Sequence, residues 1–134
     1  MISYRVGNDI DVETFIDVVR DSTLGERRPV DDRERMRQML ERANLVVSAW
    51  EDERLIGVAR SLSDFTYATY LSDIAVRLAY QRRGVGRELI RRTQAEGGRA
   101  TVFLFAAPKA VDYYARIGFA AGSGWVLRPE ETLR

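Results

Sequence analysis

One stretch constrains the fold of this chain more than any other. An apolar run, Asp73 to Val76, leads within a few residues into a basic turn that carries two glycines, Gln81 to Arg87. Apolar or small side chains then recur at helical spacing, at Val85, Leu89, Ile90 and Thr93. This pattern predicts a strand, a turn and a helix that the turn opens. The start of a helix presents unpaired backbone N–H groups and a partial positive charge, so it favours an anion.

The composition of the turn supports phosphate binding. Gly84 and Gly86 let a ligand approach the backbone closely, because no Cβ intervenes. Positive charge surrounds the same point, at Arg82, Arg83 and Arg87. The turn is not a P-loop, which needs Gly-Lys-Ser/Thr, and it is not a dinucleotide fingerprint, because Leu89 stands where a small residue is required. The turn is therefore predicted to be a phosphate cradle of another kind.

The overall composition limits what else the protein does. A length of 134 residues suits a single domain, residues 1–134, with a full hydrophobic core. With 21 basic and 20 acidic residues the net charge is +1, so no overall field attracts nucleic acid or an anionic membrane. The absence of cysteine and histidine excludes thiolate chemistry and the commonest general base, and it argues against a metal site. No membrane span or signal peptide is recognisable, which predicts a cytoplasmic protein.

The remaining pattern predicts an α/β fold with one mixed central sheet. The expected order is strand, helix, helix, strand, strand, strand, helix, strand, helix, strand. The expected strands cover residues 2–6, 45–50, 55–62, 67–76, 101–106 and 119–127. The expected helices follow Asp11, Asp31 or Asp32, and the basic turn, and the last runs from Pro108 to Ile117. The strand at 101–106 is apolar on both faces, as in the interior of a sheet.

Two motifs resemble the Gcn5-related N-acetyltransferases (GNAT superfamily). The turn from Gln81 to Gly86 matches the family's Gln/Arg-x-x-Gly-x-Gly/Ala signature. The segment from Ala110 to Phe119 resembles its Ala-x-x-aromatic-Tyr-x-x-x-Gly-Phe segment, and the order of elements agrees. The stretch from Phe103 to Phe119 is also somewhat similar to the aralkylamine (serotonin-type) acetyltransferases of plants and cyanobacteria.

The resemblance implies an enzyme that uses acetyl-coenzyme A (acetyl-CoA) as co-substrate. An acetyl group would pass to a primary amine of a small molecule by direct attack of the amine on the thioester. The pantetheine arm would pair with the backbone of Ile74, Ala75 and Val76. The pyrophosphate would be bound by Arg82, Arg83, Gly84, Val85, Gly86 and Arg87. Tyr114 stands at the position of the family's proton donor to the leaving thiolate.

The general base is not assigned by this resemblance. Tyr70 stands about where relatives carry a catalytic glutamate, and Ala107-Pro108 replace an asparagine that often contacts the cofactor. Asp73 is our first candidate, because it flanks the Ile-Ala-Val segment and the aralkylamine-type relatives carry Asp there. Asp64 is the second candidate and water the third. Either aspartate could instead be bound to the backbone at a strand end or a turn.

The acceptor side is expected to be bordered by Arg27, Arg28, Pro29, Phe65, Tyr67 and Tyr70, although strands also use aromatic residues for packing alone. Two alternative functions remain open from the sequence: a non-catalytic acyl-CoA-binding module, and an acetyltransferase of protein lysines or N-termini. Symmetric dimers are common among such domains, and a homodimer is left open. The sequence does not identify the acceptor amine or the preferred acyl chain length.

Overall fold

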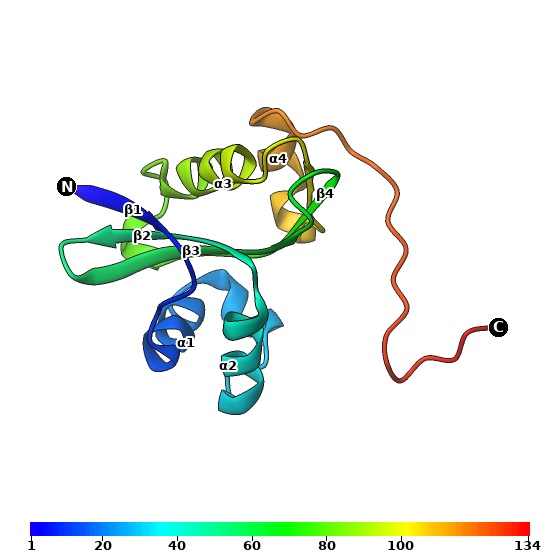
Figure 1. Ribbon diagram of the computed structural model, residues 1–134, viewed down its shortest axis with the longest axis horizontal. Coiled ribbons are helices and arrows are strands. Elements are labelled where there is room, and N and C mark those ends of the chain that lie inside the picture. The colour runs from blue at the N-terminus through cyan, green and yellow to red at the C-terminus, as the bar shows by residue number, and fades with distance from the viewer. The chain divides into compact units, whose positions relative to one another are not determined.

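The computed structural model describes residues 1–134, and Figure 1 shows its course. The chain divides into two compact units, Met1–Leu104 and Phe105–Arg134. The first unit holds the sheet and three α-helices, and the second holds the last helix and the C-terminal segment. Each unit is described by itself.

The first unit is built on a five-stranded sheet in which spatial order follows chain order, β1 to β5. Neighbouring strands are antiparallel except β5, which is parallel to β4. The strands are β1 (Ile2–Val6), β2 (Leu45–Glu51), β3 (Arg54–Ser63), β4 (Ala68–Val76) and β5 (Thr101–Phe103). The prediction of an α/β fold with one mixed sheet is therefore confirmed.

The two helices before β2 begin at aspartates that cap them. Helix α1 (Val12–Arg20) starts after Asp11, whose carboxylate accepts from the Thr14 N–H at 3.0 Å. Helix α2 (Arg33–Arg42) starts after Asp32, whose carboxylate accepts from the Arg35 N–H at 3.1 Å. Of the two caps left open by the sequence, Asp32 is the one used. Between the helices lies a short 3-10 helix, η1 (Thr23–Arg27).

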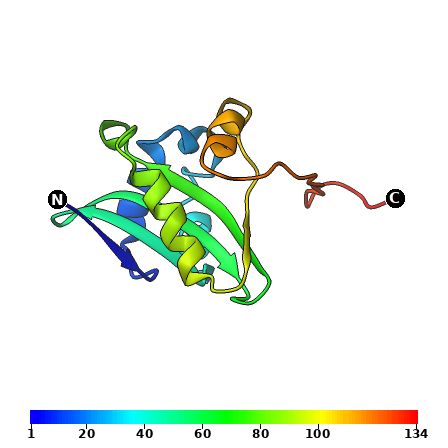
Figure 2. The same ribbon diagram turned by 90° about the horizontal axis from the view of Figure 1, so that it is seen from above.

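Helices cover both faces of the sheet in this unit. Helices α1 and α2 lie on one face, and α3 (Val85–Glu96) crosses the other (Figures 1 and 2). The core between α1, α2 and the sheet includes Phe15, Val18 and Met36, all fully buried. On the opposite face, Gly57 allows α3 to approach the sheet closely: a Cβ there would lie 3.2 Å from Leu89 Cδ1 and 3.3 Å from the Ala75 carbonyl oxygen.

The second unit contains the predicted last helix. A 3-10 turn, η3 (Pro108–Ala110), leads into α4 (Val111–Arg116), and the chain leaves the helix through Gly118 at φ 109°. The ring of Tyr114 packs edge-to-face against Phe119, with ring centroids 5.5 Å apart. No helix in the structure combines the length and apolar character needed to cross a bilayer.

Two expectations for the end of the chain are wrong. The strand expected at 101–106 ends at Phe103, which is 42% exposed rather than buried, because β5 is an edge strand with β4 as its only neighbour. The last strand, expected at 119–127, does not form, and Trp125 within it is 92% exposed. A strand needs a partner to satisfy its backbone groups, and the second unit contains no other strand.

The close approach of α3 at Gly57 yields a test. We expect Gly57→Val to lower the free energy of unfolding by about 1–3 kcal/mol, because the added methyl groups overpack a filled interface. Urea denaturation followed by circular dichroism measures this change. An unchanged midpoint would mean that α3 moves away from the sheet without cost.

Candidate active site

A β-bulge bends β4 at its centre. Arg60 pairs with Asp73, but the next residue of β3, Ser61, pairs with Leu71, so Ser72 is the extra residue. A bulge increases the local twist and redirects side chains. Strand β5 pairs with β4 only from Ala68 to Tyr70, before the bulge. From Leu71 onward, β4 therefore has a neighbouring strand on one side only.

This one-sided stretch exposes backbone groups for an extended ligand. The Arg77 N–H donates to the Ile56 carbonyl oxygen of β3 at 2.9 Å. Because bonding alternates along an antiparallel pair, the backbone of Ala75 is directed toward β3, and that of Ile74 and Val76 toward the one-sided edge. The Val76 carbonyl accepts from Gln81 Nε2 at 2.9 Å. The edge thus offers both backbone groups of Ile74 and the N–H of Val76.

In the turn Gln81–Arg87, where the sequence predicts a phosphate cradle, the backbone is left-handed at Gly84. Gly84 is the N-cap of α3 and adopts φ 81°, a left-handed conformation that favours glycine. No side chain caps this helix, and a Cβ at Gly84 would meet no atom within 4 Å. The first N–H groups of α3 are therefore suited to bind an anion from outside the chain.

The charges around the cradle favour an anion. No ion pair holds Arg82, Arg83 or Arg87. The guanidinium of Arg83 lies over the ring of Tyr80, 5.0 Å from its centroid. The only acid in the first turn of α3 is Glu88, and hydrogen bonds from Arg91 and then Arg92 lower its pKa to about 2. The negative charge of Glu88 is thus compensated by its own helix neighbours.

Asp73, the first candidate for the base, lies fully buried in a double ion pair. Its Oδ1 accepts from Arg28 Nε at 2.5 Å, and its Oδ2 accepts from Arg60 Nε. Both carboxylate oxygens are thus occupied by guanidinium donors. The pairing joins residues 45 and 13 positions apart, and for this reason sequence reasoning missed Arg60 altogether.

Asp64, the second candidate, lies in the turn between β3 and β4. Its Oδ1 accepts from the backbone N–H groups of Tyr67 at 2.7 Å, Thr66 at 2.9 Å and Ala68 at 3.0 Å. These bonds, with Tyr67 first, lower the pKa of Asp64 below its usual value. This carboxylate has the geometry of a turn residue bound to the backbone.

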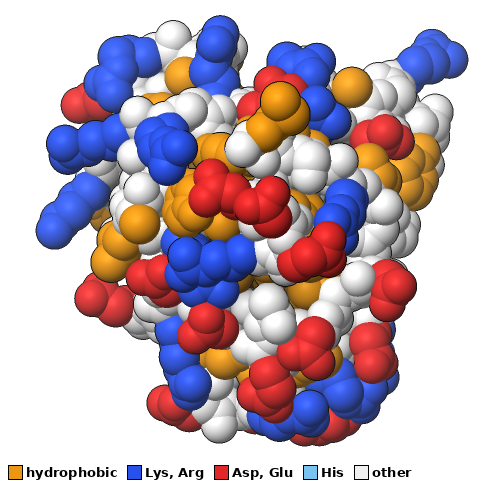
Figure 3. Space-filling model, turned by 90° about the vertical axis from the view of Figure 1, so that its left-hand side faces the viewer, with side chains coloured by type: hydrophobic (Ala, Val, Ile, Leu, Met, Phe, Trp, Pro, Cys, Tyr) orange, Lys and Arg blue, Asp and Glu red, His pale blue; other side chains and the backbone are white.

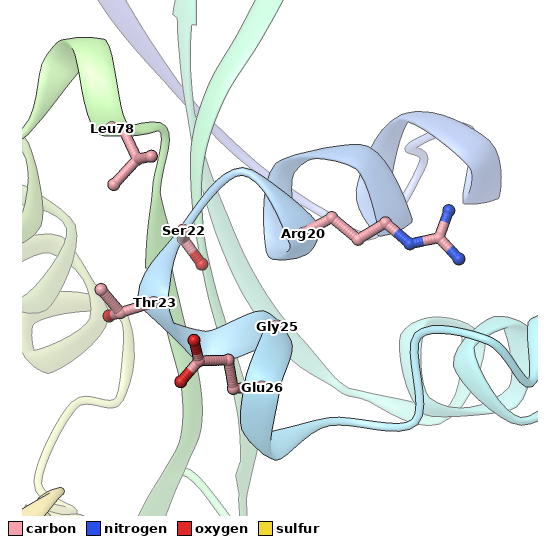
Figure 4. A pocket seen from close by; sticks show the side chains of 6 residues that line it. All are labelled: Arg20, Ser22, Thr23, Gly25, Glu26 and Leu78. Atoms are coloured by element: carbon pink, nitrogen blue, oxygen red, sulfur yellow. The ribbon is translucent and has the colours of Figure 1, made fainter.

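A pocket of about 370 Å³ lies between η1 and Leu78, as Figure 4 shows. Its lining residues are Arg20, Ser22, Thr23, Gly25, Glu26 and Leu78. Leu78 begins the 3-10 turn η2 (Leu78–Tyr80), which joins β4 to the cradle. The carboxylate of Glu26, which sequence reasoning did not single out, gives this pocket an acidic group.

Comparison with known proteins establishes the family. Residues 12–124 match the model of the acetyltransferase (GNAT) domain, so this chain belongs to the GNAT acetyltransferase family. The resemblance stated from the two motifs is thereby confirmed: the chain carries a GNAT acetyltransferase domain. The roles of individual site residues, Tyr114 among them, stay predictions.

Particular relatives agree with this assignment. An uncharacterized ycf52-like N-acetyltransferase of Prochlorococcus marinus is 32% identical over 111 residues, which cover 78% of this chain and 57% of that protein. Thus the chain spans little more than half of this relative's length. In fold it is similar to the GNAT family protein SP0256 of Streptococcus pneumoniae (TM-score 0.76, 22% identity, 96% of this chain and 99% of that one). It is also similar to AAC(6')-Iy in complex with the bisubstrate analogue CoA-S-monomethyl-acetylneamine (TM-score 0.73, 18% identity, 98% and 99%).

The cradle geometry predicts a loss of cofactor affinity when bulk is added. Gly86 lies half-buried in the first turn of α3, and we expect Gly86→Val to abolish measurable binding of coenzyme A, because the side chain would occupy the approach to the helix start. Isothermal titration calorimetry measures the affinity. Gly122→Val is the matched control, since a Cβ at Gly122 meets no atom within 4 Å. Unchanged affinity of the Gly86 variant would contradict the cradle.

Proposed function

We propose that this protein transfers the acetyl group of acetyl-CoA to a primary amine of a small molecule. The observation that carries the proposal is the one-sided edge of β4, which ends only eight positions before an uncapped helix start at Gly84. Coenzyme A has a matching order of groups: its extended pantetheine arm would pair with the strand edge, and its diphosphate would bind at the helix start. The residues present therefore fit coenzyme A.

Backbone groups supply most of the proposed contacts with the donor. The N–H groups of the first α3 turn hold the pyrophosphate, and Arg82, Arg83 and Arg87 add mobile positive charge. The edge at Ile74 and Val76 binds the pantetheine arm as an additional strand would, while the Ala75 backbone is occupied with β3. Acetyl-CoA supplies an acetyl group activated as a thioester.

The acceptor must lose a proton before it attacks. A primary amine of pKa about 10.4 requires about 4.6 kcal/mol to be neutral at pH 7. Of the three proton acceptors left open by the sequence, we propose solvent water. Three backbone N–H groups occupy Oδ1 of Asp64. The carboxylate of Asp73 is fully buried, and guanidinium groups occupy both of its oxygens.

Tyr114 is proposed as the donor to the leaving thiolate. A phenol of pKa about 10 that gives its proton to a thiolate of pKa about 8.5 does so uphill, by roughly 2 kcal/mol. The hydroxyl therefore stabilises developing charge by donating a hydrogen bond, and it completes proton transfer only as the site brings the two pKa values together.

This role predicts a specific kinetic defect. Tyr114→Phe keeps the ring and removes the hydroxyl, so we expect kcat to fall by about 10²–10³, within the usual range for an acid catalyst. Steady-state release of free thiol measures the rate. Tyr113→Phe, on the same helix turn, is the matched control and should retain activity. A Tyr114 variant within twofold of the wild type would remove this residue from the mechanism.

The proposed reaction itself is tested by a panel of amines. Acetyl-CoA is incubated with spermidine, tyramine, neamine, a lysine-containing peptide or no amine, and free thiol is followed. We expect thiol release that depends on one of the small amines, with the acetylated amine identified by mass spectrometry. Coenzyme A binding without turnover would instead identify a binding module, and turnover of the peptide alone would identify a protein acetyltransferase.

A further inference from the structure

Two arginines from separate elements bind the bulge of β4. Arg28 donates from Nε to Asp73 Oδ1 at 2.5 Å and from Nη2 to the Ser72 carbonyl oxygen at 2.7 Å. Arg60 donates from Nε to Asp73 Oδ2 and from Nη2 to Ser72 Oγ at 3.0 Å. Both residues of the bulge are thus held by guanidinium groups, one from β3 and one from beyond η1.

The other end of η1 is anchored to the residues that directly follow β4. The segment Ser22–Arg28, which we call the strap, contains η1. Just before it, Asp21 accepts from the Leu78 N–H through its carbonyl oxygen at 2.9 Å. Arg77, which follows β4, pairs with Asp17 at 2.8 Å and with Asp21 at 3.5 Å. Ion pairs therefore anchor the strap near both of its ends, at Asp73 and at Arg77.

The pocket lies between these anchors. Strap residues Thr23 and Glu26 form one side of it and Leu78 lies on the other, as Figure 4 shows. The distance between the strap and η2 therefore sets the width of the pocket. Arg20, the cation among the lining residues, is paired with Asp31, and its guanidinium points away from Glu26 (Figure 4). The Glu26 carboxylate can therefore attract a cation, and a protonated amine is the cation that the proposed reaction consumes.

Of the residues in this ion-pair cluster, Arg28 can be removed with the least damage to the fold. Its side chain is 20% exposed, and without it Asp73 keeps the Arg60 partner. Removal of Asp73 would instead leave the buried guanidinium of Arg60 without its ion-pair partner, which is strongly destabilising. Variants at Arg28 therefore separate placement of the strap from the integrity of the core.

We propose that Arg28 is a positioning residue for the amine acceptor. It holds the strap against the bulge through Asp73 and Ser72, and so fixes the wall of the pocket that the amine enters. This inference rests on the proposed acetyl transfer. It also makes the role of Asp73 structural, because its buried carboxylate orients Arg28 and Arg60.

The test compares Arg28→Met, Arg28→Lys and the wild type. With spermidine or tyramine, whichever the wild type acetylates, Arg28→Met should raise the KM for the amine about tenfold and leave the KM for acetyl-CoA within twofold. Arg28→Lys should recover part of this loss, since it restores the charge beside Asp73 but not the fixed fork of a guanidinium. Arg33→Met is the matched control, because Arg33 pairs with Glu13 on the exposed side of the helices.

Hydrogen exchange provides a readout that does not depend on activity. Peptides that cover residues 22–32 should exchange faster in Arg28→Met than in the wild type or in Arg33→Met. Unchanged exchange would overturn the anchoring of the strap, and faster exchange with an unchanged KM for the amine would overturn the positioning role. A wild type that acetylates none of the amines would overturn the proposed function, and the exchange result would still decide whether Arg28 anchors the strap.

Discussion

A single buried carboxylate holds the centre of the first unit together. Asp73 lies out of solvent at the bend of β4 and bears a negative charge that two guanidinium groups balance. Burying a charge is costly unless it is paired and hydrogen-bonded, and at Asp73 the buried Arg60 and the partly exposed Arg28 together offset this cost. Through them the bulge is tied to β3 and to the segment that follows η1. Segments that lie far apart in the chain are thereby fixed in one arrangement.

The bulge and the short β5 together shape the edge of the sheet at which we propose that the donor binds. Before the bulge, β4 has neighbours on both sides, and beyond it the strand has only β3. The released edge continues, through the η2 turn, into the helix start at Gly84. The unpaired backbone groups of β4 are therefore followed, after η2, by the N-terminus of α3. Together they offer hydrogen bonds and a partial positive charge to a ligand, without a large net charge. On the face in Figure 3, Lys and Arg side chains are interspersed with Asp and Glu, in keeping with a net charge of +1.

The sequence predicted what depends on local pattern and failed where distant partners decide. Caps, periodicity and glycines located the first four strands, all four helices and the glycine turn that opens α3, because each is governed by residues within a few positions. The Arg60–Asp73 pair and the bulge at Ser72 depend on the register of two strands, which no local pattern contains. The segment 119–127 has strand-like composition but no partner strand in its own unit, so composition alone overestimated it. Likewise, the role of Tyr114 came from family resemblance rather than from pattern, and that resemblance left the general base unassigned.

The way the strap is anchored separates two properties that enzymes often encode in the same residues. Its position is determined by the ion pairs of Arg28 and Arg77 with their aspartates, whereas the chemistry of the pocket wall is determined by Thr23 and Glu26 between those anchors. In the proposed reaction, substitutions at Thr23 and Glu26 therefore change which amines are preferred without disturbing the ion pairs that hold the strap in place. Divergence among copies of such a gene could proceed by exchange of a few side chains, with no insertion, deletion or refolding of the surrounding sheet.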